Sequence, residues 1–325
     1  MYGRLNIYHF KFSWLQKRGD VMEVLMRNVF QTLGKNRSAN QLAKKYGLRF
    51  GASRFIAGET IEAAIHTVQT LNEHGKVVTL DHLGEFVFTE EEAIESALMC
   101  IRTLEAIAEA GVTSNLSLKL TSIGLDIRKD LCMQNLRKIL DTAKLYDNFV
   151  RIDMEDYAHC QVSIDIYEEL RKEYDNVGLV IQAYLYRTEQ DMHELNKCRA
   201  NLRLVKGAYK ESPNVAFPDK KDVDENFQSI IKTHLLNGNY TAIASHDEQI
   251  ITYTKQFVKE NNIPNEQFEF QMLYGICVEL QDQLVKEGYK VRVYVPYGID
   301  WFGFFMRRLA ERPANVWFVV KNLFK

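Results

Sequence analysis

Two adjacent arginines near the end of the chain, Arg307 and Arg308, precede Glu311 by four and three residues. On a helix this spacing places both guanidinium groups beside the carboxylate. Arginine binds carboxylates in a bidentate fork, so an oriented pair is suited to clamp a substrate anion. A solvent-exposed charge cluster has the same spacing, and the motif alone leaves both interpretations open.

The residues just before this helix predict a strand over Lys290–Val295 and a Pro-Tyr-Gly turn. Side chains alternate along an extended chain, so Arg292 and Tyr294 share one face of that strand. An arginine clamp would therefore follow a strand that carries polar side chains on one side.

Four charged residues each lie inside an apolar, strand-like run: Lys119, Asp153, Arg203 and Lys206. A buried unpaired charge is costly, so each of them needs an ion partner or a charged ligand. A structural ion pair would explain any one of them, whereas four at equivalent strand ends favour a ligand site. Lys206 also suits the Schiff-base lysine of a class I aldolase.

Other chemistries have weaker signals. A metal-dependent hydrolase is suggested by two pairs of possible ligands, Asp81-His82 and His246-Asp247. The signal is weak, because the first strand has no His-x-His pair and no other close pair of metal ligands is present. The G-x-S-x-G elbow of serine hydrolases is absent. A barrel that only binds a ligand also remains open, because one fold hosts many functions.

The elements that position these residues follow a repeated strand–helix pattern, with helices expected for example over 90–110 and 130–146. Eight strands, each followed by a helical run, predict a (β/α)₈ barrel, an α/β fold whose chemistry lies at the carboxyl ends of the strands. A doubly wound sheet is the alternative, but the chain has neither G-x-G-x-x-G nor a P-loop. The predicted strands cover 76–84, 115–124, 149–155, 177–184, 201–209, 241–247, 268–275 and 290–298.

The chain of 325 residues is expected to form a single domain. A helical extension is predicted over residues 1–70, with Asp20–Lys45 at helical spacing, and the barrel over 76–325. The low proline count and the lack of Ser/Gly-rich linkers favour this organisation.

Composition limits the partners. A net charge of −2 argues against nucleic acid as the main partner. Five scattered cysteines without a C-x-x-C pair indicate a reducing compartment. No apolar run suits a signal peptide or a bilayer span, so a cytoplasmic protein is expected. Trp317–Phe324 is a candidate for peripheral membrane contact, although a final helix packed on the barrel is the favoured interpretation.

A set of motifs, in order along the chain, resembles proline dehydrogenase of the short monofunctional bacterial type. This resemblance implies a distorted (β/α)₈ barrel that holds FAD non-covalently. It also implies oxidation of L-proline to Δ1-pyrroline-5-carboxylate, with electrons passed to a membrane quinone at the inner face of the cell membrane. The motifs are SLKLTSIG, RIDMEDY, IQAYLYRT, LRLVKGAYKE, ASHD, FQMLYGI, VYVPYG and FMRRLAERPAN.

The resemblance also implies roles for individual residues. Arg307 and Arg308 would hold the proline carboxylate with Lys119, and Glu311 would orient the arginines. Asp153 stands at the position treated as catalytic, and Arg203 would lie beside the flavin. The remaining implied contacts are Ala208, Tyr209, Leu273 and Tyr294 around the proline ring, and Met154, Gln182, Val205, Lys206, Gly207, Ser245 and His246 for FAD.

Two further expectations concern specificity and charge. Tyr294 is typical of proline-preferring members, so hydroxyproline should be a poor substrate; Phe304 stands where some relatives carry tyrosine. We expect Asp153 to orient and balance the charge of Lys119 rather than to abstract a proton, because a carboxylate beside the substrate amine would favour the ammonium form.

Overall fold

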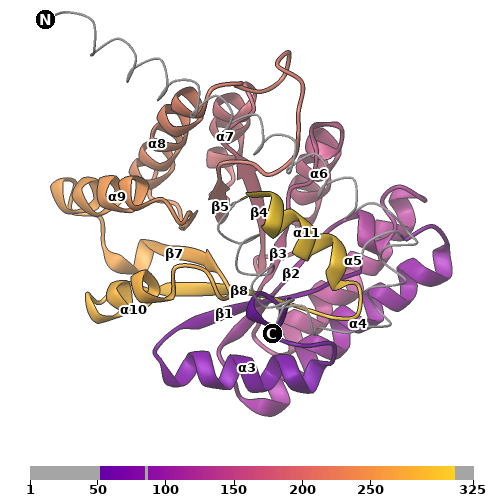
Figure 1. Cartoon of the computed structure of the whole chain (residues 1–325). Coiled ribbons are helices and arrows are strands. Elements are labelled where there is room, and N and C mark those ends of the chain that lie inside the picture. The colour runs from indigo at the N-terminus through magenta and orange to yellow at the C-terminus, as the bar shows by residue number, and fades with distance from the viewer. Residues whose placement is uncertain (1–51, 85–86, 312–325) are drawn as a thin grey trace, which may run out of the picture. The chain divides into compact units, whose positions relative to one another are not determined.

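The structure, a computed structural model, describes residues 52–84 and 87–311. Within these residues eight parallel strands pair in sequence order and close into a barrel, with helices α3 to α10 around the outside of the strands (Figure 1). The predicted (β/α)₈ fold is confirmed. The strands are β1 Val77–His82, β2 Ser114–Leu118, β3 Val150–Ile152, β4 Val177–Gln182, β5 Leu202–Val205, β6 Thr241–Ala244, β7 Phe268–Leu273 and β8 Val291–Tyr297.

The helices alternate with the strands, and the prediction over 90–110 has the bounds that α4 shows. Thr89 begins α4 with a capping box to Glu92, and Gly111 ends it in the left-handed conformation. The helices are α3 Ile61–Glu73, α4 Glu90–Ala110, α5 Lys129–Leu145, α6 Tyr157–Leu170, α7 Thr188–Lys197, α8 Lys220–Leu236, α9 Glu248–Glu260, α10 Val278–Lys286 and α11 Trp301–Glu311.

Most strands end before their predicted limits. The run over 115–124 leaves the sheet after Leu118 and turns through the 3₁₀ segment η3, Thr121–Ile123. Gly124 follows with φ of 104°, a conformation that a side chain would strain. The polar residues at several strand ends therefore belong to the loops that carry the site.

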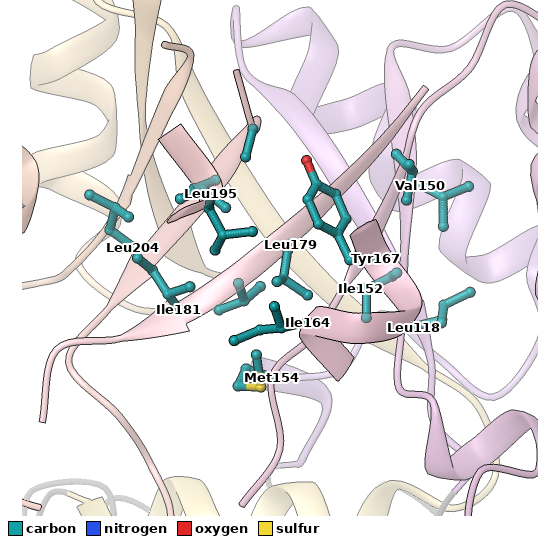
Figure 2. Close-up of a cluster of buried hydrophobic side chains, with 14 of the residues drawn as sticks. Leu118, Val150, Ile152, Met154, Ile164, Tyr167, Leu179, Ile181, Leu195 and Leu204 are labelled. Carbon is teal, nitrogen blue, oxygen red and sulfur yellow. The ribbon is translucent and has the colours of Figure 1, made fainter. Parts of the chain in front are cut away.

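The apolar core lies between the strands and the helices. On β2 to β5 the alternate residues Leu118, Ile152, Leu179 and Leu204 pack with side chains of α6 and α7 (Figure 2). Because strand side chains alternate, the residues between them point into the barrel. Several inward residues are polar or charged, among them Ser117, Arg151 and Gln182, in contrast to the branched apolar residues that usually fill such barrels.

Three charged residues occupy the barrel interior near the amino ends of the strands. Arg292 Nε lies 2.7 Å from Glu269 Oε1. Arg151 donates to the carbonyl oxygens of Leu179 at 3.1 Å and Asn201 at 2.6 Å. A Cβ on Gly178 would lie 2.4 Å from Arg151 Nη1, so glycine leaves room for the guanidinium.

The chain divides into two compact units. One covers 57–298 and holds the barrel; the other contains 1–56 and 299–325, of which the structure describes 52–56 and 299–311. In the second unit the ring of Phe305 in α11 lies 6.2 Å from that of Phe55, measured between ring centroids, and the two ring planes are tilted by 39°. The predicted segments Asp20–Lys45 and Trp317–Phe324 lie outside the described residues, as does most of the expected helical extension. Among the residues described, no helix combines the length and apolar character needed to cross a bilayer.

Candidate functional site

Arg203 of β5 is the centre of a polar network inside the barrel. Its Nη1 donates to Asp153 Oδ1 at 2.6 Å and to Ser117 Oγ at 3.3 Å, and its Nε donates to Gln271 Oε1 at 2.6 Å. Ser117 and Gln271 belong to β2 and β7, which do not neighbour β5. These bonds therefore cross the barrel interior, and they fix the guanidinium in one orientation.

Tyr294 of β8 links this network to β1. Its hydroxyl oxygen lies 2.6 Å from Asp81 Oδ2 and 2.8 Å from Asp153 Oδ2. The Arg203 guanidinium lies 5.2 Å from the centre of the Tyr294 ring. Burial, and then the charges of Asp153 and Asp81, raise the pKa of Tyr294 well above its ordinary value, so the phenol keeps its proton.

Lys119, the residue after β2, pairs with Asp81 through a contact of 3.0 Å between Nζ and Oδ2. Asp153 forms its ion pair with Arg203. We had expected Asp153 to balance Lys119; the ion pairs in the structure assign Asp81 to Lys119 and Arg203 to Asp153. The two predicted cations and the predicted carboxylate nevertheless lie in one connected network.

β4 and β5 carry a buried acceptor and a buried donor that no described residue satisfies. These are Gln182 Oε1 and Arg203 Nη2. The other amide atom of Gln182, Nε2, is fixed by the carbonyl oxygen of Glu155 at 2.9 Å. A buried polar atom without a partner is costly, so the pair fits a planar heterocycle that offers both an N–H donor and an acceptor. A flavin ring is such a group.

The loop after β5 approaches the barrel closely at Gly207. Its φ is 120°, and a Cβ there would lie 2.3 Å from the Tyr184 ring. Lys206 is held by Asp224 and by Asp247, the latter at 2.7 Å. The two carboxylates occupy the Nζ atom that a Schiff-base lysine must present to a carbonyl carbon, so these contacts weigh against the aldolase alternative.

The remaining predicted barrel residues also lie at strand ends. His246 Nε2 accepts from the backbone N–H of Leu273 at 2.9 Å, and Ser245 Oγ accepts from the N–H of Asp247 at 3.1 Å. Val205 is the last residue of β5, and Ala208 and Tyr209 are exposed in the loop that follows it. The Met154 side chain is buried in the core between strands and helices (Figure 2).

The arginine pair lies on α11 in the second unit. The Arg308 guanidinium lies 4.9 Å from the centre of the Phe304 ring, and the Arg308 residue is buried. The side chains of Arg307 and Glu311 lie outside what the structure describes. The proposed clamp on the substrate carboxylate thus stays a prediction.

The sequence does not indicate that three residues belong to this network: Asp81, Ser117 and Gln271. Asp81 is 1% exposed, and burial raises the pKa of its carboxyl group, which Lys119 opposes and Asp153 reinforces. In the sequence Asp81 stands out only beside His82 as a weak metal-ligand pair, and Gln271 lies inside a predicted strand, so neither position indicates these partners. Ser117 shows no such signal, because serine is ordinary in a strand.

Comparison with known proteins decides the family. A profile of the family described as "Proline dehydrogenase" matches residues 64–321. Proline dehydrogenase 1 of Bacillus subtilis (strain 168) is 55% identical over 301 residues, which cover 93% of this chain and 100% of the relative. The chain belongs to the proline dehydrogenase family. The family resemblance predicted from the motifs is confirmed.

More distant members agree. The proline dehydrogenase of Deinococcus radiodurans is 43% identical over 310 residues, covering 94% of this chain and 100% of the relative. Among solved structures, proline utilization A (PutA) from Bdellovibrio bacteriovorus, inactivated by N-propargylglycine, superimposes with a TM-score of 0.76 at 26% identity. That match covers 80% of this chain and 32% of the much longer PutA chain.

Proposed function

We propose that this protein is the flavoenzyme that begins proline catabolism: it oxidises L-proline to Δ1-pyrroline-5-carboxylate with non-covalently bound FAD. Membership of the proline dehydrogenase family supports proline oxidation. The observation that supports a flavin at this site is the pair of buried atoms, Gln182 Oε1 and Arg203 Nη2, without a partner among the described residues. In this role Gln182 and Arg203 would hold the flavin ring, which supplies the hydride acceptor when bound.

The substrate carboxylate requires cations, and Lys119, the residue after β2, has a side chain that is 17% exposed to solvent. Arg307 and Arg308 would complete the clamp, with Glu311 to orient them. A clamp on the carboxylate fixes the orientation of a five-membered ring, and hydride transfer depends on that orientation. The pocket around the proline ring would be formed by Tyr294, Leu273, Ala208 and Tyr209.

The proline amine must lose its ammonium proton before its lone pair can assist hydride loss. The positive charges of Lys119 and Arg203 disfavour a third cation beside them. Asp153 acts in the opposite direction, but its charge is balanced by Arg203 at 2.6 Å. We therefore assign Asp153 to holding Arg203 and Tyr294 in place, rather than to proton abstraction.

The proposed electron acceptor is a membrane quinone, reached by peripheral contact at the inner face of the membrane. This part of the proposal rests on the family resemblance. A soluble short-chain quinone tests it: it should reoxidise the proline-reduced enzyme in repeated turnovers. Reduced enzyme that quinones leave unchanged, while dioxygen reoxidises it, would remove quinone from the proposal.

The visible spectrum of the purified protein tests the flavin. We expect the two absorption bands of an oxidised flavin, bleaching of these bands by L-proline, and release of FAD on denaturation. Gln182→Leu should lower FAD retention, with Gln161→Leu on the outer helix α6 as the matched control. A colourless protein that takes up no added FAD would refute the proposal, and borohydride trapping of a carbonyl substrate on Lys206 would favour the aldolase instead.

A further inference from the structure

The carboxyl group of Asp81 contacts both Lys119 and Tyr294. Its Oδ2 atom lies 3.0 Å from Lys119 Nζ and 2.6 Å from Tyr294 Oη. These contacts join β1 to the loop after β2 and to β8, from a residue only 1% exposed. A carboxyl group so placed determines where the Lys119 ammonium and the Tyr294 ring lie.

The hydroxyl of Tyr294 has two short contacts but only one proton. Asp81 Oδ2 at 2.6 Å and Asp153 Oδ2 at 2.8 Å are both within hydrogen-bond distance. An ionised carboxylate is an acceptor only, so the phenol can satisfy one of the two. The second contact needs a proton from the carboxyl side, because two oxygen atoms at this distance repel without one.

The partners decide which carboxyl group carries that proton. Asp153 Oδ1 already accepts from Arg203 at 2.6 Å and from Ser117 at 2.7 Å. Asp81 has one cation partner and is more deeply buried, and burial raises its pKa. The titratable and charged groups around Asp81 are Lys119, Asp153, Arg203 and Tyr294, with Cys100 of α4 and Tyr297 of β8, whose own pKa values burial raises.

We propose that Asp81 is a positioning residue for proline binding, and that Asp81 and Asp153 share one proton across the hydroxyl of Tyr294. The proton lies mainly on Asp81, which donates to the Tyr294 oxygen, while Tyr294 donates to Asp153. One of the two charges that would neutralise Lys119 and Arg203 is then removed. The site keeps a net positive charge, complementary to a substrate carboxylate.

This inference rests on the proposed function, and it predicts how the affinity for a carboxylate ligand changes with pH. The shared proton is present below the raised pKa of Asp81 and is lost as pH rises through it. Above that pH, ionised Asp81 neutralises the charge of Lys119 and competes with the substrate carboxylate for this cation. Affinity for a carboxylate ligand should therefore fall as pH rises, even for a ligand that has no amine to titrate.

Infrared difference spectra between mildly acidic and alkaline pH test the proton itself and need no proline. We expect the C=O band of a buried carboxylic acid in the wild-type protein and its loss in Asp81→Asn. Glu155→Gln is the control, because burial also raises the pKa of Glu155, and that variant should keep the band. A wild-type spectrum without the band, or a band lost in Glu155→Gln and kept in Asp81→Asn, overturns the shared proton.

Binding of cyclopentanecarboxylate, followed by calorimetry, tests the positioning role. The wild-type Kd should rise with pH, and Asp81→Asn should flatten that rise, because an amide keeps the shape of the carboxyl group and carries no charge at any pH. Asp81→Ala removes both contacts and should raise KM for proline by about 10- to 100-fold, the range for hydrogen bonds to charged groups, with a smaller change in kcat. Asn should restore part of this loss.

Equal KM values for Asp81→Ala and wild type overturn the positioning role. So does a fall in kcat alone for a folded variant with full FAD content. If the protein does not oxidise proline at all, the infrared and calorimetric results still stand, so the two proposals fail separately.

Discussion

The buried ion pair between Glu269 and Arg292 allows a quantitative prediction of stability. Glu269 is 1% exposed, and its two carboxylate oxygens accept from Arg292 at 2.7 Å, Gln271 at 2.5 Å and Tyr240 at 2.8 Å. Burial by itself would raise the pKa of Glu269, yet the Arg292 charge and these hydrogen bonds lower it to about 2. Removing the carboxylate leaves Arg292 as a buried cation without its partner.

The magnitude follows from that pKa. A fall from 4.5 to about 2 corresponds to about 3 kcal/mol, since each pH unit is worth about 1.4 kcal/mol. The stabilisation is fully present above the unfolded-state pKa of 4.5 and is lost as pH falls through about 2. Breaking a buried pair by removing one partner typically costs about 3–5 kcal/mol. We expect Glu269→Gln to lower the free energy of unfolding by this amount at neutral pH.

Urea unfolding of wild type and Glu269→Gln, followed by far-UV circular dichroism, measures this difference. Glu225→Gln is the control, because Glu225 and Lys221 form an exposed pair at 3.6 Å, and its cost should stay within about 0.5 kcal/mol. The gap between wild type and Glu269→Gln should narrow as pH falls from 4.5 toward 2. Equal losses in the two variants, or a gap that does not change with pH, would refute the reasoning.

Three further predictions follow from the site. Gly207→Ala places a methyl group 2.3 Å from an aromatic ring at a φ of 120°, so it should lower FAD content and the melting temperature, both measurable on the purified protein. Gly238→Ala is its control, because Gly238 also has a positive φ, of 73°, but open space around the added methyl group. Arg307→Met and Arg308→Met should each raise KM for proline strongly while FAD stays bound; unchanged proline kinetics in both would return the pair to a surface charge cluster. With Tyr294 present, kcat/KM for trans-4-hydroxyproline should be well below that for proline, and comparable values would contradict its role in specificity.

The fold was predictable from the sequence because apolar runs and amphipathic helices alternate eight times. The ends of the strands were not. Leu118, Leu120 and Ile123 read as one apolar run, yet the last two leave the sheet and are buried against α5 and its neighbours. An apolar run predicts that its residues are buried. Tertiary contacts decide whether the backbone there is extended or turned.

The candidate site was predictable in its members but not in its pairings. Lys119, Asp153 and Arg203 were recognisable as charges inside apolar strands, and all three belong to the network. Which carboxylate meets which cation depends on the stagger of strands around the closed barrel, which brings residues of non-neighbouring strands together across the interior. That is why the sequence does not indicate Asp81 as the partner of Lys119, from which it is far along the chain.

Gln271 connects the two charged layers of the barrel interior. Its Nε2 donates to Glu269 Oε1 at 2.5 Å, and its Oε1 accepts from Arg203 Nε at 2.6 Å. Glu269 accepts only, and Arg203 donates only, so these two neighbours permit a single orientation of the amide. The ion pair of Glu269 and Arg292 therefore orients Arg203 through Gln271. Because this chain of bonds is continuous, stability and the geometry of the site depend on the same interior side chains.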